Sequence, residues 1–313
     1  MAVQPTRIVR RATAPISALA TAARRPSTYT GHLREATSVA ITAAMWPLGL
    51  RDGDPVDEET SSRTTAQTPV LLLHGFGANK SNWLLVRRRV EQAGFGRVHA
   101  MNYNPLRANI AELAEHAAER AEALRAAYGT RTVHLVGHSL GGLIARYAVQ
   151  VHGLGGAATC ITIASPHGGV RIARYGSPLS RLSPLAAGLE LRPGSVVMRR
   201  LRDTARPMDT TFVAYYSNLD LIVPARRAMI QEAELCATNV LVKDHGHLSI
   251  MLSRRLASSI VDQLAVAEGF GGYGTAVVPL DGARRAPRTL ARAGPGEADG
   301  STGSVRSATG GRG

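Results

Sequence analysis

The chain has few of the residues that mark disulfide-rich or metal-binding proteins. Its 313 residues include two cysteines, Cys160 and Cys236, whose spacing alone does not establish a disulfide. Cys160 lies in the apolar run TCITIA, which predicts a buried small side chain rather than a reactive one. Neither CxxC nor a metal-ligand spacing occurs. The sequence therefore gives no sign of a disulfide scaffold or a zinc module.

Lysine and aromatic residues are also scarce. Lys80 and Lys243 are the only lysines, although 37 basic residues against 23 acidic ones give a formal net charge of +14. The positive charge is thus nearly all arginine, spread along an Ala- and Gly-rich chain. Aromatic residues make up 4% and do not alternate with arginine, as a base-stacking surface requires. We expect an aliphatic core and no nucleic-acid partner.

No apolar run is long enough for a membrane-spanning helix, which needs about 20 residues. The best candidate, residues 36–50, contains Pro47 and predicts a helix, for which two placements stay open. It packs on the domain, which we favour, or lies against a membrane interface. The stretch after Arg7, Arg10 and Arg11 fits a secretory signal poorly. A cytoplasmic or membrane-peripheral location is favoured, and secretion stays an alternative.

Composition divides the chain into three parts. Residues 1–68 form an N-terminal extension with the apolar helix and a polar linker, and residues 69–270 form the main domain. That domain is long enough to bury a sizeable core. Residues 271–313 are rich in Gly, Ala and Arg and bury too little apolar surface to fold, so disorder is predicted there. The sequence carries no signal for an oligomeric state.

Within the main domain, short apolar runs alternate with helical patterns. Continuous runs such as PVLLLHG are typical of strands that are buried on both faces. Strands separated by helices imply right-handed crossovers. We therefore predict an α/β fold, a mainly parallel sheet with helices on both faces. The predicted strands are 69–75, 97–103, 131–137, 158–165, 209–217 and 237–244, and the predicted helices are 81–94, 107–129 and 252–269.

The segment GHSLG fits the pattern G-x-S-x-G, with Ser139 at its centre. The bare pattern is weak, because a glycine-rich chain can contain it by chance. Its context is stronger, since it follows a buried-looking strand and opens a helical pattern, as a nucleophile elbow does. Gly137 and Gly141 are then needed because a Cβ would clash with the neighbouring strand and helix. The alternative is a glycine-rich turn without a chemical role.

A serine nucleophile needs a base and an orienting acid. In this chain order both follow the serine, each after a strand. Asp220 follows the predicted strand 209–217, and His247 follows the last strand and opens a helix-like segment. We therefore predict Asp220 as the acid and His247 as the base. Weaker candidates for the base and the acid are His245, Asp244, Asp203 and Asp209.

An oxyanion hole requires two backbone N–H donors. We expect one from Leu140, directly after the serine, and one from Phe76 in the loop HGFG after the first strand. Gly75 and Gly77 let this backbone approach a substrate. HGFG also fits a plain glycine turn, and we expect His74 to be a packed structural residue.

Five segments, VLLLHGFGANKSNW, VHLVGHSLGGLIARYAV, ITIASPHGG, YYSNLDLIVP and HGHLSIM, occur in an order that resembles the α/β-hydrolases. The resemblance is specifically to bacterial triacylglycerol lipases and esterases, over roughly residues 69–265. It implies Ser139 as nucleophile, Asp220 as acid and His247 as base. SPHGG resembles a loop beside the site, where we expect His167 to be structural. The resemblance covers neither terminal part and does not fix the substrate.

These features together predict a serine hydrolase that cleaves carboxylic esters of acylglycerols or related lipids, without a metal or organic cofactor. An acyltransferase or thioesterase with the same three residues stays an alternative, and a noncatalytic lipid-binding protein is a third. Residues 170–208 carry eight arginines and two acidic residues. They are expected to form a lid or acyl-binding wall, or else a solvated helical excursion. Their basic character is compatible with peripheral contact with a lipid surface.

Overall fold

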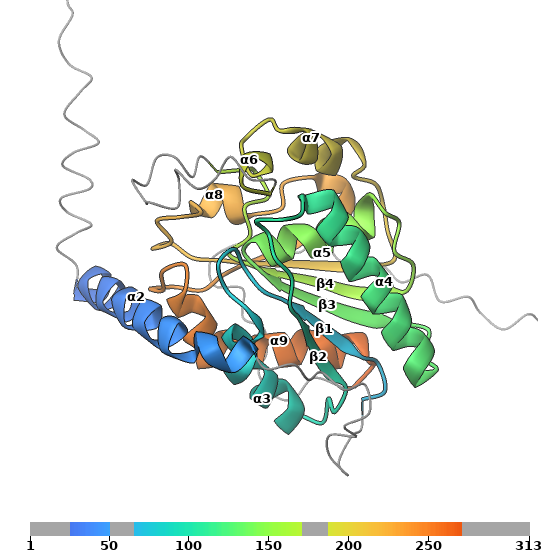
Figure 1. Ribbon diagram of the computed structural model, residues 1–313, viewed down its shortest axis with the longest axis horizontal. Helices are drawn as coiled ribbons and strands as arrows, with labels where there is room; N and C mark the ends of the chain where they lie inside the picture. The colour runs from blue at the N-terminus through green and yellow to red at the C-terminus, as the bar shows by residue number, and fades with distance from the viewer. Residues whose placement is uncertain (1–25, 51–65, 171–186, 271–313) are drawn as a thin grey trace, which may run out of the picture. The chain divides into compact units, whose positions relative to one another are not determined.

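Six parallel strands form the centre of the computed structural model, which describes residues 26–50, 66–170 and 187–270 (Figure 1). Their order is β2-β1-β3-β4-β5-β6, and every neighbouring pair is parallel. The predicted fold class, a mainly parallel sheet with helices on both faces, is confirmed. The strands are β1 (Val70–Leu73), β2 (Val98–Met101), β3 (Val133–His138), β4 (Ala157–Ile163), β5 (Thr211–Tyr216) and β6 (Thr238–Leu241).

The sheet divides the core into two apolar clusters, one on each face. In β1, Leu71 and Leu73 join one cluster, while Val70 and Leu72 join the other, because successive side chains of a strand point to opposite faces. Both faces are buried, which explains the continuous apolar runs in the sequence. The first cluster contains residues of α4 (Ile110–Tyr128), α5 (Leu140–Gln150) and α7 (Val196–Asp203), and the second contains residues of α3 (Leu84–Gln92) and α9 (Arg254–Ala267).

Local capping sets the ends of the longest helix in the main domain. Asn109 and Glu112 form a capping box, so α4 begins at Ile110 and not at Arg107 as the periodicity predicted. Gly129 ends it with a φ of 62°, the left-handed conformation that glycine adopts without strain. Shorter helical segments are η2 (Lys80–Trp83), α6 (Ala187–Glu190), α8 (Ala225–Ala228), η5 (Ala233–Leu235) and η6 (Ser249–Leu252).

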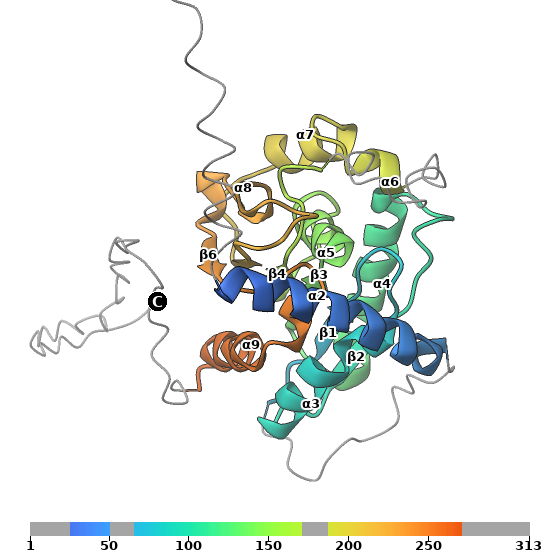
Figure 2. The ribbon, with the colours of Figure 1, turned by 90° about the vertical axis from the view of Figure 1, so that its left-hand side faces the viewer.

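The N-terminal apolar segment is helical and contacts the main domain. α2 (Pro26–Met45) begins ten residues before the predicted start and continues into the 3₁₀ helix η1 (Trp46–Leu50). Pro47 has no N–H to donate, so a regular α-helix does not continue past this point. α2 packs against η2 and η6 and crosses in front of the strands in Figure 2. None of the described helices is long and apolar enough to cross a membrane.

All described residues belong to one compact unit, Met1–Leu280. Residues 51–65 of the predicted linker, 171–186 of the predicted lid and the predicted disordered part 271–313 lie outside the described residues. The described end of the predicted lid, α6 and α7, packs against the domain through buried side chains of Ala187, Val197 and Leu201. Cys160 is buried and Cys236 is exposed, and both are free thiols.

Candidate active site

Ser139 occupies the sharp connection between β3 and α5. Its φ of 54° and ψ of −118° are a strained conformation for a residue with a side chain, and its N–H donates to the carbonyl of Ile163 at 2.8 Å. A Cβ at Gly137 would lie 2.4 Å from the backbone of Gly141, and one at Gly141 would lie 2.1 Å from the carbonyl oxygen of Leu73. The crowding that we expected around a nucleophile elbow is present on both sides of the serine.

The structure brings Ser139, His247 and Asp220 into one hydrogen-bonded chain. Ser139 Oγ lies 3.0 Å from His247 Nε2, and His247 Nδ1 lies 2.8 Å from Asp220 Oδ2. Because Nδ1–H donates to the carboxylate, Nε2 is free to accept the serine proton. The other oxygen of Asp220 accepts N–H bonds from Ile222 and Val223, both at 2.8 Å. The carboxylate is therefore fixed, with its whole side chain buried.

The competing residues lie elsewhere. His245 donates from Nδ1 to the carbonyl of Lys243 at 2.7 Å, and Asp244 turns the loop with a φ of 62°. Asp203 pairs with Arg202 on the surface, and Asp209 is exposed. None of these four residues has a recorded hydrogen bond or ion pair to His247 within the described parts of the chain.

The loop after β1 lies against Ser139, the candidate nucleophile. A Cβ at Gly75 would be 3.1 Å from the Cβ of Ser139, so the neighbouring N–H of Phe76 belongs to the same small region. Within the described ranges, the N–H groups of Phe76 and Leu140 have no recorded acceptor. The first turn of α5 adds the positive potential of a helix N-terminus. The region therefore suits an oxyanion.

His138 is a site residue that the sequence interpretation missed. Its buried ring donates from Nε2 to the carbonyl oxygen of His247 at 3.0 Å, and the two ring centroids are 5.1 Å apart. Burial, together with the neighbouring His247, lowers the pKa of His138 to about 3, so the ring is neutral. It holds the backbone that carries the base. In the sequence, only its position between Gly137 and Ser139 indicated that it belongs to the site.

His74 and His167 are both buried, and the structural role that we expect of them stays a prediction. Burial lowers the pKa of His74 to about 4, and its Nδ1–H donates to the carbonyl of Gly75 at 2.8 Å. Its ring stacks on Tyr103 at 4.1 Å, and the Tyr103 hydroxyl donates to the His74 carbonyl. Burial lowers the pKa of His167, which is hydrogen-bonded to Thr162 at 2.9 Å. His74 thus shapes the loop that carries Phe76.

A second missed residue comes from the N-terminal helix. Glu35 of α2 accepts the N–H groups of Leu248 and Ser249 at 2.8 and 2.9 Å, directly after the candidate base His247. No local pattern predicts this contact, because more than 200 residues separate its two sides.

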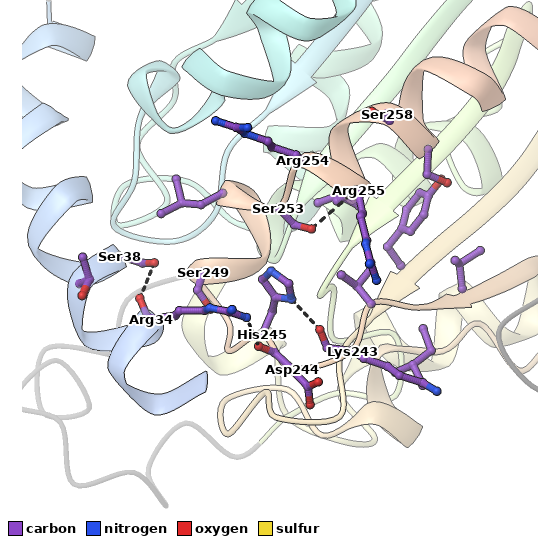
Figure 3. A pocket seen from close by; sticks show the side chains of 18 of the residues that line it. Arg34, Ser38, Lys243, Asp244, His245, Ser249, Ser253, Arg254, Arg255 and Ser258 are labelled. Carbon is purple, nitrogen blue, oxygen red and sulfur yellow. Dashed lines mark hydrogen bonds between the residues drawn. The ribbon is translucent and has the colours of Figure 1, made fainter. Parts of the chain in front are cut away.

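A cavity of about 1360 Å³ is lined by residues of α2, β6, the loop after β6 and the start of α9 (Figure 3). Its lining includes Arg34, Lys243, His245, Arg254 and Arg255, and it includes none of the three hydrogen-bonded residues. Among the described residues, no three His, Cys, Asp or Glu side chains are grouped closely enough to hold a metal ion.

Residues 70–214 match the sequence profile of the alpha/beta hydrolase family. Over this segment the sequence resembles the alpha/beta hydrolase family, and the predicted resemblance is confirmed at this level. The matched segment contains Ser139 and Phe76 and ends before Asp220 and His247.

Solved structures of lipases share the fold. The mature lipase BlEst2 of Bacillus licheniformis is 20% identical, with a TM-score of 0.54 over 68% of this chain and 96% of that one. Lipase B of Aspergillus fumigatus is 16% identical, with a TM-score of 0.51 over 66% of this chain and 54% of that one. At these identities the likeness concerns the fold alone. No curated protein sequence matches the chain.

Proposed function

We propose that this protein cleaves carboxylic esters through an acyl-enzyme, as a lipase or carboxylesterase acting on acylglycerols or related lipid esters. One observation carries the proposal: the hydrogen-bonded chain from Ser139 through His247 to Asp220, with distances of 3.0 and 2.8 Å. This arrangement provides a nucleophile, a general base and a group that orients the base. Proteins of the same fold that are named lipases support esters as the substrate class.

In the first step, Ser139 Oγ attacks the ester carbonyl carbon while His247 Nε2 takes the hydroxyl proton. The N–H groups of Leu140 and Phe76 bind the resulting oxyanion, and each donor is worth about 3 kcal/mol in the transition state. His247 then gives its proton to the leaving alcohol oxygen as the C–O bond breaks. Asp220 keeps Nδ1 protonated and stabilises the positive imidazolium.

In the second step, a water molecule takes the place of the alcohol. His247 removes a water proton as the oxygen attacks the acyl carbon, and the collapse of the second oxyanion returns the proton to Ser139 and releases the acid. The chemistry uses only side chains and backbone groups of the chain itself. An acyl acceptor other than water would convert the same steps into acyl transfer.

The test is turnover of p-nitrophenyl esters of increasing acyl length, combined with labelling by a fluorophosphonate. We expect hydrolysis and stoichiometric labelling of Ser139, and we expect Ser139→Ala to fold normally and to remain unlabelled. Labelling of the Ser139→Ala variant would place the nucleophile elsewhere. Absence of turnover on every ester would remove the hydrolase proposal, and turnover only with a non-water acceptor would favour acyl transfer.

We further propose that the enzyme meets its substrate at an anionic lipid surface through exposed apolar side chains of α2 and η1. Six of the fourteen exposed large apolar side chains of the described residues lie in residues 26–50, and residues 36–50 contain no charged side chain. The net charge of +14 complements anionic lipid headgroups. The six side chains are those of Leu33, Val39, Ile41, Trp46, Leu48 and Leu50.

Vesicle flotation tests this surface with the full-length chain. We expect binding to phosphatidylserine-containing vesicles that is lost in Leu48→Ser/Leu50→Ser and retained in Leu85→Ser/Val266→Ser, which changes two equally exposed apolar residues on other helices. Equal binding of both double variants would refute the assignment. A dimer of the unchanged chain that dissociates in the Leu48→Ser/Leu50→Ser variant would assign the surface to a second copy instead.

A further inference from the structure

The N-terminal segment of residues 26–50, α2 with η1, contacts three separate loops of the candidate active site. We call this segment the strap. It lies outside the part of the chain that matches the family, and in Figure 2 it crosses in front of the strands, where their carboxyl ends carry the site. The three loops carry the candidate base, the candidate acid and the Phe76 oxyanion donor.

The contact with the base loop is the most polar of the three. Both carboxylate oxygens of Glu35 accept backbone N–H groups, from Leu248 at 2.8 Å and from Ser249 at 2.9 Å. A Cβ at Gly246 would lie 2.3 Å from the same carboxylate, so Glu35 rests directly on the backbone on both sides of His247. Charge-assisted bonds of this kind are about twice as strong as neutral ones.

The contact with the acid loop is between the backbone of Gly31 and the side chain of Leu219. A Cβ at Gly31 would lie 2.4 Å from the end of this side chain, which belongs to the residue directly before Asp220. Glycine at this position therefore lets α2 pack against the acid loop with Leu219 in its present rotamer.

The contact with the oxyanion loop runs through Asn79, three residues after Phe76. Its side-chain amide donates to the carbonyl of Trp46 at 2.7 Å, and its oxygen accepts the N–H of Ser81 at 3.0 Å. A Cβ at Gly49 would overlap the Asn79 side chain, so η1 lies directly on it. Asn79 is buried and links the strap to the turn after β1.

A hollow flanks the strap on one side. The cavity of about 1360 Å³ is lined on the strap side by Leu33, Arg34, Thr37 and Ser38 (Figure 3). Continuous apolar packing is therefore interrupted along this part of α2. Polar contacts such as those of Glu35 and Asn79 contribute to its position, and Glu35 makes its contact through a carboxylate.

We propose that Glu35 is a positioning residue for the catalytic base, and that the strap fixes the base, acid and oxyanion loops relative to one another. The inference rests on the proposed function. Efficient proton transfer requires placement of the imidazole within about 0.5 Å, and a displacement of 1 Å costs on the order of 100-fold in rate. Without Glu35, the Leu248 and Ser249 N–H groups lose their acceptor, and the backbone next to His247 is free to shift.

The experiment compares Glu35→Gln and Glu35→Ala with Glu119→Gln and Glu119→Ala, which change an exposed glutamate on α4. We expect kcat for a short-chain p-nitrophenyl ester to fall about 10-fold in Glu35→Gln, which keeps one acceptor, and about 100-fold in Glu35→Ala. KM should change less than about 2-fold, because Glu35 does not touch substrate. Fluorophosphonate labelling of Ser139 should slow by the same factors as kcat, and the Glu119 variants should match the unchanged enzyme.

Circular dichroism and thermal unfolding check that each variant folds. If Glu35→Ala does not fold, Glu35→Gln alone serves as the test. Folded Glu35 variants with unchanged kcat and labelling rates would overturn the inference, as would a loss confined to KM. A chain without any substitution that neither labels nor hydrolyses esters would instead overturn the proposed function, so the two failures are distinguishable.

Discussion

Gly141 offers the sharpest test of the elbow geometry. A Cβ at this position would lie 2.1 Å from the carbonyl oxygen of Leu73 and 2.6 Å from that of His74, both backbone atoms that cannot rotate away. Ordinary contact needs about 3.4 Å, so Gly141→Ala must move α5 away from β1 by about 1.3 Å. That movement carries Ser139 and the Leu140 N–H with it, since both belong to the start of α5.

We expect Gly141→Ala to lower kcat on p-nitrophenyl esters on the order of 100-fold, as a displacement of about 1 Å does. Overpacking should also lower the free energy of unfolding by about 1–3 kcal/mol, measured by urea denaturation. Gly155→Ala is the matched control, because no atom lies within 4 Å of a Cβ there. If Gly141→Ala keeps the kcat and the unfolding free energy of Gly155→Ala, the crowded elbow is not what positions the nucleophile.

Two further predictions concern glutamates away from the site that bind a buried side chain. Arg146 is fully buried and pairs with Glu232 at 2.9 Å, so Glu232→Gln should lower the free energy of unfolding by about 3 kcal/mol, and a loss below about 1 kcal/mol in urea denaturation would contradict this. The pKa of Glu268 is held below its usual value, first by the hydrogen bond from His134. The carboxylate therefore stabilises the fold above its ordinary pKa and loses this contribution as the pH falls through the lower folded value. The stability difference between the unchanged chain and Glu268→Gln should shrink in urea titrations towards acid pH, and a constant difference would refute the linkage.

The sequence predicted the elements that local patterns specify. The apolar runs of β1 and β3 each lie in one short stretch, where the strand pattern can be recognised. The glycines around Ser139 also lie in one short stretch, where the steric requirement for glycine can be recognised. The same logic placed Asp220 and His247 after their strands, and the structure brings both to Ser139. Their chemical roles stay predictions until the labelling and turnover experiments are done.

The supporting contacts were not predictable, and the reason is physical. Glu35 contacts the base loop, which lies more than 200 residues away in the sequence. The charge pattern of α2 does not indicate a partner for it. His138 acts through a backbone carbonyl, which every residue has. Asn79 also binds a backbone carbonyl, that of Trp46, so no residue type in the sequence marks its partner. Sequence motifs specify side chains, whereas these contacts are specified by where distant backbones meet.

The strap also bears on how this chain can be shortened. A chain trimmed to the family-matched segment and the two later site residues would start near Val70 and would still contain Ser139, Asp220 and His247. It would nevertheless lack the carboxylate beneath the histidine-bearing turn and would expose the surfaces that α2 covers. Engineering that preserves only this region would keep all three candidate catalytic residues and discard a contact that we propose aligns them.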